Sequence, residues 1–218
     1  MTATPEYLLH NKVRLGLHHL RGGDGRALLL LHGLGEQTPA AVPTFAAGWA
    51  GPVYGLDFTG HGQSTIPAGG GYTAEILMAD AAIALDHLGS ATVAGRGLGA
   101  YIALLVAGAR PQAVRGAVLD DGPGLHGGGT QPGSPVIAHP GPATGPPDPY
   151  ALIELARDVR PADYATSFVH QATHLSGLAE PVAVAARVRP PWMEAILDDP
   201  GVVEMDAAAA LAMYAAID

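Results

Sequence analysis

Eight side chains that can donate, accept or transfer a proton stand in short turns directly after apolar runs of the sequence. They are His32, Glu36, Asp57, His61, Arg96, Asp120, Asp121 and His126. A histidine beside a carboxylate can gain and lose a proton near neutral pH. The set therefore predicts general acid–base chemistry on a bound substrate without a covalent step, with candidate groups at His32, His61, His126 and Asp121.

The same residues also have a structural interpretation. His32 can shape a His-Gly turn through its ring nitrogens, and Asp57 and His61 can hold the turn that follows the next apolar run. Asp120 can pair with Arg96, and ion-pair networks of this kind perturb pKa values without any catalytic role. Both interpretations stay open at the level of the sequence.

Metal binding is a weaker hypothesis. His170 and His174 have the i, i+4 spacing of one helix face, and His18 and His19 are adjacent. No H-E-x-x-H pattern or nearby carboxylate joins either pair. We expect no metal site and no cofactor.

The apolar runs that carry these turns read as short strands separated by helices. The expected strands are Leu28–Leu31, Val53–Leu56, Ala91–Ala94, Gly116–Leu119, Val182–Ala185 and Val202–Met205, which are apolar on both faces, and Glu6–His10 and Val13–His19, which alternate. The expected helices run from the capping residue Thr73 to Leu88, from Leu98 to Arg110 and from Asp206 to Ile217. Doubly apolar strands are typical of parallel sheets covered on both faces. The sequence therefore predicts an α/β protein with a sheet of about eight strands.

A long segment from Pro123 to Pro149 breaks this alternation. It contains eight prolines and is also rich in glycine, so it predicts a loop without regular structure. Loops of this length in compact domains are usually lids, binding loops or linkers. We expect a lid that gates the pocket, with a hinge at the triple glycine 127–129 that carries His126 in and out. An excursion without a role is the alternative.

Three turns together resemble a known family. The first is His32-Gly33-Leu34, the second is the D-x-x-G-H-G-x-S sequence from Asp57 to Ser64, and the third is the glycine-rich sequence from Gly95 to Ala100. In this order and spacing the chain resembles the α/β-hydrolase fold from about residue 6 to its C-terminus. The resemblance implies a mostly parallel sheet of about eight strands with helices on both faces. From the length of the chain between the sixth and seventh strands we expect no large cap domain, because Pro149 to Leu178 suffices for only about two helices.

The resemblance also assigns roles to residues. The family's nucleophile elbow reads G-x-S-x-G, and Gly97 stands in this chain where that serine would be. The resemblance places the two oxyanion-hole N–H groups at Leu34 and Leu98. A substrate would then lie against Gly33, Leu34, Glu36, Arg96 and Leu98.

The remaining triad positions depart from the family pattern. No carboxylate follows the strand Val182–Ala185, and no histidine lies beyond His174. Asp121 does supply an acid after the sixth strand. Because a designed knock-out would have left the late histidine in place, its absence argues against an engineered Gly97. The resemblance implies a hydrolase-like protein without a complete Ser-His-Asp triad that binds a small apolar carbonyl or carboxylate compound. Either it is a non-catalytic homologue, or it is a hydrolase or lyase with a non-covalent acid–base mechanism.

A dinucleotide site is the alternative interpretation of the same glycines. Gly95-Arg96-Gly97-Leu98-Gly99-Ala100 satisfies G-x-G-x-x-G/A, with Asp120 or Asp121 about 25 residues further on. That fingerprint normally follows the first strand of its sheet, and it leaves the other two turns unexplained. We therefore favour the hydrolase-like interpretation.

Composition limits the class of protein and of partner. The chain has 218 residues, of which 48% are hydrophobic and 14% charged, and we expect residues 1–218 to form one domain. A net charge of −9 repels nucleic acid and anionic membranes, and no apolar stretch is long enough to cross a bilayer. The absence of cysteine and of a signal-peptide pattern favours the cytoplasm. The expected partner is a small molecule, with monomer and homodimer both open.

Overall fold

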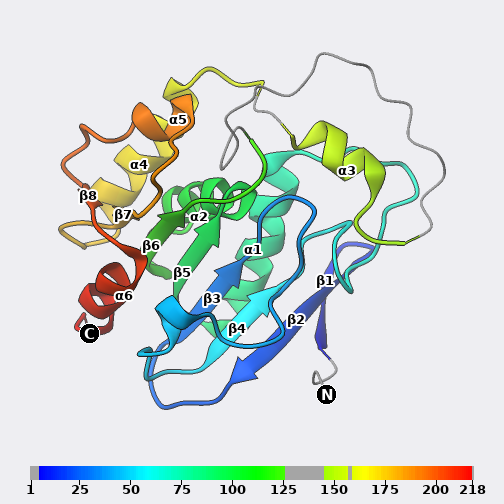
Figure 1. The fold of residues 1–218 in the computed structure, drawn as a ribbon, viewed down its shortest axis with the longest axis horizontal. Coiled ribbons are helices and arrows are strands. Elements are labelled where there is room, and N and C mark those ends of the chain that lie inside the picture. The colour runs from blue at the N-terminus through cyan, green and yellow to red at the C-terminus, as the bar shows by residue number, and fades with distance from the viewer. Residues whose placement is uncertain (1–4, 126–144, 157–158, 218) are drawn as a thin grey trace.

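A single sheet of eight strands lies at the centre of the computed structural model, which describes residues 5–125, 145–156 and 159–217 (Figure 1). The strands are β1 (Glu6–His10), β2 (Val13–Arg21), β3 (Ala27–Leu31), β4 (Val53–Leu56), β5 (Ala91–Arg96), β6 (Val114–Asp120), β7 (Val182–Val184) and β8 (Val202–Glu204). Their order is β1-β2-β4-β3-β5-β6-β7-β8. β2 is antiparallel to both of its neighbours, whereas all the pairs from β4 to β8 are parallel. The predicted sheet of about eight mostly parallel strands is confirmed.

The central strands are buried because both of their faces are apolar. Every residue of β3 is buried. Leu29 and Leu31 pack into the core on one face of the sheet, and Leu28 and Leu30 pack into the core on the other. This alternation of side chains along a strand gives the sheet two hydrophobic layers.

Helices cover both faces, as predicted. One face packs against α1 (Ala74–Leu88), α2 (Leu98–Ala109) and α4 (Asp163–Leu175). The other packs against the single 3-10 turn η1 (Thr44–Ala46) and α6 (Ala207–Ala215). Two short helices, α3 (Pro149–Glu154) and α5 (Pro191–Glu194), complete the set in the described residues. The second face therefore has the thinner cover.

The helix ends follow the signals seen in the sequence. The hydroxyl oxygen of Thr73 accepts a hydrogen bond from the N–H of Ile76 at the start of α1, and Gly89 ends that helix. Asp206 caps α6 in the same way. α2 ends before Pro111, as expected of a residue that cannot continue a helix.

The turn from β5 into α2 packs backbone directly against backbone. A Cβ atom at Gly95 would lie 2.0 Å from the carbonyl oxygen of Gly99, and one at Gly99 would lie 2.2 Å from that of Leu31. Only glycine allows this approach. It brings the start of α2 against the end of β3, which places the turns after these two strands side by side.

The stretch between β6 and β7 holds α3 and α4, and the described residues contain no large cap. Most of the expected lid, including the triple glycine and His126, lies outside the described residues, so the lid stays a prediction.

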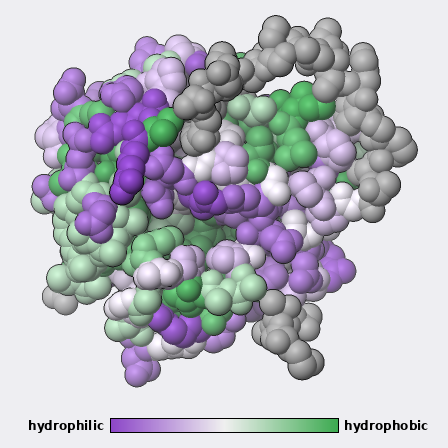
Figure 2. Space-filling view, viewed as in Figure 1, coloured by the Kyte–Doolittle hydropathy of each residue, from purple (hydrophilic) through white to green (hydrophobic). Residues whose placement is uncertain are grey.

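No helix in the described ranges combines the length and apolarity needed to span a bilayer. On the face of the molecule shown in Figure 2, hydrophilic residues form a band across the middle, with hydrophobic residues above and below it.

Asp57 braces the turn that follows β4. Its buried carboxylate accepts hydrogen bonds from the N–H groups of Thr38 and Gln63, both at 2.8 Å, and from Nε2 of His18 at 2.9 Å. The hydroxyl of Ser64 donates to the carbonyl oxygen of Asp57 at 2.5 Å. Burial opposes the charge, but these donors, led by His18, outweigh it and lower the pKa of Asp57 to about 2. The D-x-x-G-H-G-x-S sequence is thus accounted for by contacts that hold the turn.

Replacing Asp57 by asparagine tests this brace. Asp57→Asn is expected to lower the free energy of unfolding by roughly 1.5–3 kcal/mol at pH 7, because the amide cannot accept all three bonds. The folded pKa of about 2 lies below the ordinary 3.8, so the charge stabilises the protein above pH 4 and loses its effect as the pH falls towards 2. Urea unfolding at pH 7 and pH 3 should therefore show a smaller difference between wild type and variant at pH 3. The exposed Asp24→Asn is the control, and an equal difference at both pH values would contradict the brace.

Candidate functional site

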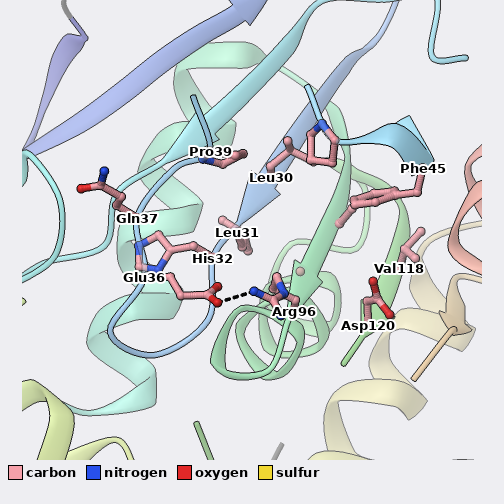
Figure 3. A pocket seen from close by; sticks show the side chains of 13 residues that line it. Leu30, Leu31, His32, Glu36, Gln37, Pro39, Phe45, Arg96, Val118 and Asp120 are labelled. Atoms are coloured by element: carbon pink, nitrogen blue, oxygen red, sulfur yellow. Dashed lines mark hydrogen bonds and ion pairs between the residues drawn. The ribbon is translucent and has the colours of Figure 1, made fainter. Parts of the chain in front are cut away.

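The carboxyl ends of the parallel strands bring the predicted turns together at one edge of the sheet. His32 follows β3, Arg96 ends β5 and Asp120 ends β6. These three side chains and Glu36 line one pocket, and Figure 3 shows Arg96 between Glu36 and Asp120. Open α/β sheets place their ligand sites at this edge.

Gly97 forms the turn between β5 and α2, as the sequence predicts. Its backbone has φ 53° and ψ −116°, in the region of positive φ that favours glycine. The N–H of Gly97 donates to the carbonyl oxygen of Asp120 at 3.0 Å. The turn is therefore joined to the end of β6 as well as to α2.

The two N–H groups expected to form an oxyanion hole converge on one oxygen atom. Leu34 N–H and Leu98 N–H each donate to the carbonyl oxygen of Pro123, both at 2.9 Å. The oxygen, however, belongs to the chain itself, and in this arrangement it stands where a ligand oxygen was expected.

The backbone around Pro123 also fills the space above Gly97. We call Gly122-Pro123-Gly124 the occluding turn. A Cβ atom at Gly97 would lie 2.3 Å from both the carbonyl carbon of Gly122 and the carbonyl oxygen of Pro123. A Cβ at Gly33 would lie 2.6 Å from the Pro123 ring. A serine at position 97 is incompatible with this backbone.

Contacts on both sides hold the occluding turn in place. On one side, Nε of Arg96 donates to the carbonyl oxygen of Asp121 at 3.2 Å. On the other, the buried Leu125 donates its N–H to the Leu155 carbonyl and accepts from Nε1 of Trp192, each at 3.2 Å. The turn is thus tied to β5, to the end of α3 and to α5.

Asp121 is engaged in the same region. Its two carboxylate oxygens accept hydrogen bonds from the N–H groups of Arg187 at 2.8 Å and Val188 at 2.9 Å. These bonds join the end of β6 to the loop after β7. The carboxylate therefore has a structural contact at each of its oxygens.

His32 uses both of its ring nitrogens within the protein. Nε2 accepts from the N–H of Phe58 at 3.1 Å, which requires the proton to be on Nδ1, and Nδ1 donates to the carbonyl oxygen of Gly33 at 2.8 Å. Burial, together with the neighbouring His61, lowers the pKa of His32 to about 4. The ring is therefore neutral at pH 7 and ties the turn after β3 to the turn after β4.

His61 is completely buried beside His32, with ring centroids 5.1 Å apart. Its Nδ1 donates to the carbonyl oxygen of Thr59 at 3.1 Å, whereas Nε2 has no hydrogen-bond partner among the described residues. Burial lowers the pKa of His61. The structure thus brings two of the three predicted histidines together, and the third, His126, lies outside the described residues.

Glu36 and Arg96 form an ion pair at the edge of the pocket. One Glu36 oxygen accepts from Nη1 of Arg96 and the other accepts from the N–H of Gly33 at 3.0 Å. The side chains are 33% and 48% exposed, so water can compete for both. An ion pair this exposed stabilises a fold only slightly.

The pocket itself is a mainly apolar cavity of about 380 Å³, which we call the chamber. It is lined by Leu30, Leu31, His32, Glu36, Gln37, Pro39, Pro43, Phe45, Ala94, Gly95, Arg96, Val118 and Asp120 (Figure 3). The sequence pattern indicates His32, Glu36, Arg96 and Asp120 of this lining but not Gln37, Phe45 or the two prolines. A single 3-10 turn has no hydrophobic period that would have revealed them.

Among the described residues, no three His, Asp or Glu side chains gather as metal ligands would. His170 faces Asp199 at 3.2 Å, and the ring centroids of His170 and His174 are 6.5 Å apart. The pair of histidines on α4 thus has one carboxylate beside it.

Comparison with known proteins assigns the part of the chain that carries these turns to one family. The family model described as alpha/beta hydrolase fold matches residues 26–168. A curated relative, (E)-2-((N-methylformamido)methylene)succinate hydrolase of Acinetobacter baylyi, is 36% identical over 110 residues, which are 47% of this chain and 40% of that enzyme. The chain therefore matches less than half of the relative's length.

Two solved structures show similar partial matches. A probable hydrolytic enzyme from Pseudomonas aeruginosa PAO1 has a TM-score of 0.48 at 26% identity, covering 55% of this chain and 42% of that one. An epoxide hydrolase from Vigna radiata has a TM-score of 0.46 at 19% identity, covering 55% and 40%.

Substituting Gly97 tests the packing of the occluding turn. Gly97→Ala should lower the free energy of unfolding by about 2–5 kcal/mol, since it combines positive-φ strain with overpacking against Gly122 and Pro123. Gly177→Ala is the matched control, because Gly177 has φ 73° and nothing within 4 Å of an added Cβ. Chemical denaturation of both variants separates strain from collision. Equal losses would mean that nothing rigid lies above Gly97.

Proposed function

The chain belongs to the alpha/beta hydrolase fold family, and we propose that this member binds a small, mainly apolar carbonyl compound without hydrolysing it. One observation carries the proposal: the Pro123 carbonyl oxygen accepts from both Leu34 N–H and Leu98 N–H. A carbonyl substrate needs such a donor pair for its own oxygen as negative charge develops there. With the pair engaged by the main chain, that stabilisation is absent.

The covalent route lacks its nucleophile as well. Glycine offers no oxygen or sulfur for attack on a carbonyl carbon, and the residues beside Gly97 are Arg96 and Leu98. No histidine stands between β8 and the end of α6, where the family's general base would follow the last strand. We infer that the serine mechanism is lost in this chain.

Non-covalent acid–base catalysis is the competing proposal, and the contacts of its candidate groups disfavour it. His32 has both ring nitrogens in hydrogen bonds, and Asp121 has both carboxylate oxygens in hydrogen bonds. His61 is fully buried with a lowered pKa. A general acid or base must reach the proton that it transfers, and these three groups face the protein interior or its main chain. His126, the remaining candidate, lies outside the described residues.

The dinucleotide alternative receives no support. A pyrophosphate would need the free N–H groups at the start of α2. Gly97 N–H and Leu98 N–H already donate to the carbonyl oxygens of Asp120 and Pro123. The family match is also to a different class of protein.

The curated relative supports the carbonyl part of the proposed ligand class, since the name of its substrate contains a formamido group. A single domain over residues 1–218, a cytoplasmic location and a small-molecule partner are further parts of the proposal.

An ester-hydrolysis assay tests the proposed lack of turnover. With p-nitrophenyl acetate and butyrate, both the wild-type chain and Gly97→Ser should release nitrophenol at the uncatalysed rate. The serine gains nothing because the occluding turn occupies its place and no late histidine activates it. Gly177→Ser, the same substitution at an open turn, controls for nonspecific reactivity. Saturable hydrolysis by the wild-type protein would contradict the proposal, and activity gained only by Gly97→Ser would mean that the occluding turn moves aside easily.

A further inference from the structure

The chamber lies beside the occluding turn and not above Gly97. Its floor is formed by Leu30 of β3, Ala94 of β5 and Val118 of β6, which all face the side of the sheet that packs against η1 and α6. Phe45 of η1, which packs on the same side of the sheet, also lines the chamber (Figure 3). The wall residues are therefore apolar and come from four separate elements.

The chamber exists because this part of the sheet lacks a full helix as cover. The connection from β3 to β4 crosses it with only the 3-10 turn Thr44–Ala46 and with Pro39 and Pro43, which keep the chain extended. α6 packs against β6, β7 and η1 further along the sheet. A volume of about 380 Å³ is left open between them, within the range of small-molecule sites.

One end of the chamber is polar and includes a guanidinium, that of Arg96. The Arg96 guanidinium gives Nη1 to Glu36 and Nε to the carbonyl oxygen of Asp121. Within the described ranges Nη2 has no acceptor. The guanidinium is thus fixed at two nitrogens while a third remains available at the chamber's edge.

The charges at this end select against an anion. Glu36 and Asp120 both line the chamber with Arg96, so two carboxylates accompany one guanidinium. The net charge of −9 adds a long-range repulsion. A neutral carbonyl oxygen can accept from Nη2 without adding a third negative charge.

We propose that the chamber is the ligand site and that it takes a neutral carbonyl compound, with the apolar body between Phe45 and the sheet and the oxygen on Arg96. This inference rests on the proposed binding function and narrows it in two ways. It moves the ligand from the turn at Gly97 to the face of the sheet covered by η1, and it favours ketones or esters over carboxylates.

Two probes of equal size test the selectivity. Benzylacetone and hydrocinnamate share a phenylethyl body and differ in carrying a methyl ketone or a carboxylate. Isothermal titration of the wild-type chain should show benzylacetone binding at least tenfold more tightly than hydrocinnamate. Tighter binding of hydrocinnamate would overturn the inferred preference for a neutral ligand.

Substitutions locate the site. Ala94→Leu adds atoms to the chamber floor and should weaken benzylacetone binding at least tenfold, and Arg96→Met should weaken it about fivefold or more by removing one hydrogen bond. Arg110→Met is the matched control, because Arg110 also pairs with an exposed carboxylate, that of Asp86. This pair joins α1 to the end of α2, on the other face of the sheet from η1. The control should bind as the wild type does.

A measurement on the unmodified protein covers the case in which Ala94→Leu does not fold. Intermolecular nuclear Overhauser effects should connect the benzylacetone phenyl protons to Phe45 and Val118. Binding without these effects, or unchanged binding in Ala94→Leu, would overturn the chamber as the site while leaving a binding protein. Failure of every neutral carbonyl probe to bind the wild-type chain would overturn the proposed function as well.

Discussion

The Pro123 carbonyl oxygen accepts hydrogen bonds from Leu34 N–H and Leu98 N–H, which belong to turns after two different strands. Buried N–H groups need a partner, and the loss of one costs about 1–3 kcal/mol. A pocket that must receive a substrate oxygen leaves such donors to water until the substrate arrives. In this protein the chain supplies its own acceptor, so the two N–H groups become part of the framework.

Several other features depend on that arrangement. The main chain of Gly122 and Pro123 can approach so closely only because positions 33 and 97 are glycines. Arg96 holds the carbonyl oxygen of Asp121, and the Asp121 carboxylate in turn holds the loop after β7. The polar groups at this edge therefore mostly form hydrogen bonds that hold neighbouring turns together. The open volume lies to one side, under η1, where the sheet has its thinnest cover.

The sequence was sufficient to predict the sheet and the position of Gly97, since both follow from local signals. Buried strands such as Ala27–Leu31 are continuous apolar runs, and helix α1 carries a capping threonine and a terminal glycine. The sequence was also sufficient to predict that His32, Arg96 and Asp120 lie at one edge, because parallel strands end on the same side.

Which polar groups of the site are already hydrogen-bonded within the protein could not be predicted from the sequence. Whether Leu34 N–H and Leu98 N–H are free depends on the position of a main-chain oxygen. The identity of the residues does not reveal where a backbone oxygen lies. Histidine and aspartate look alike in a sequence whether they transfer protons or hold turns, and only the partners of His32 and Asp121 distinguish the two. The chamber has no sequence signal because it results from the absence of a helix between β3 and β4.

Scalar couplings across hydrogen bonds test most directly whether the chain occupies its own donor pair. In an NMR spectrum of the isotope-labelled protein, the amide nitrogens of Leu34 and Leu98 should both show a through-bond correlation to the carbonyl carbon of Pro123, with slow amide exchange at both positions. Rapid exchange at Leu34 and Leu98 with neither correlation present would show that the donor pair is open to a ligand, and would contradict a site closed by its own main chain.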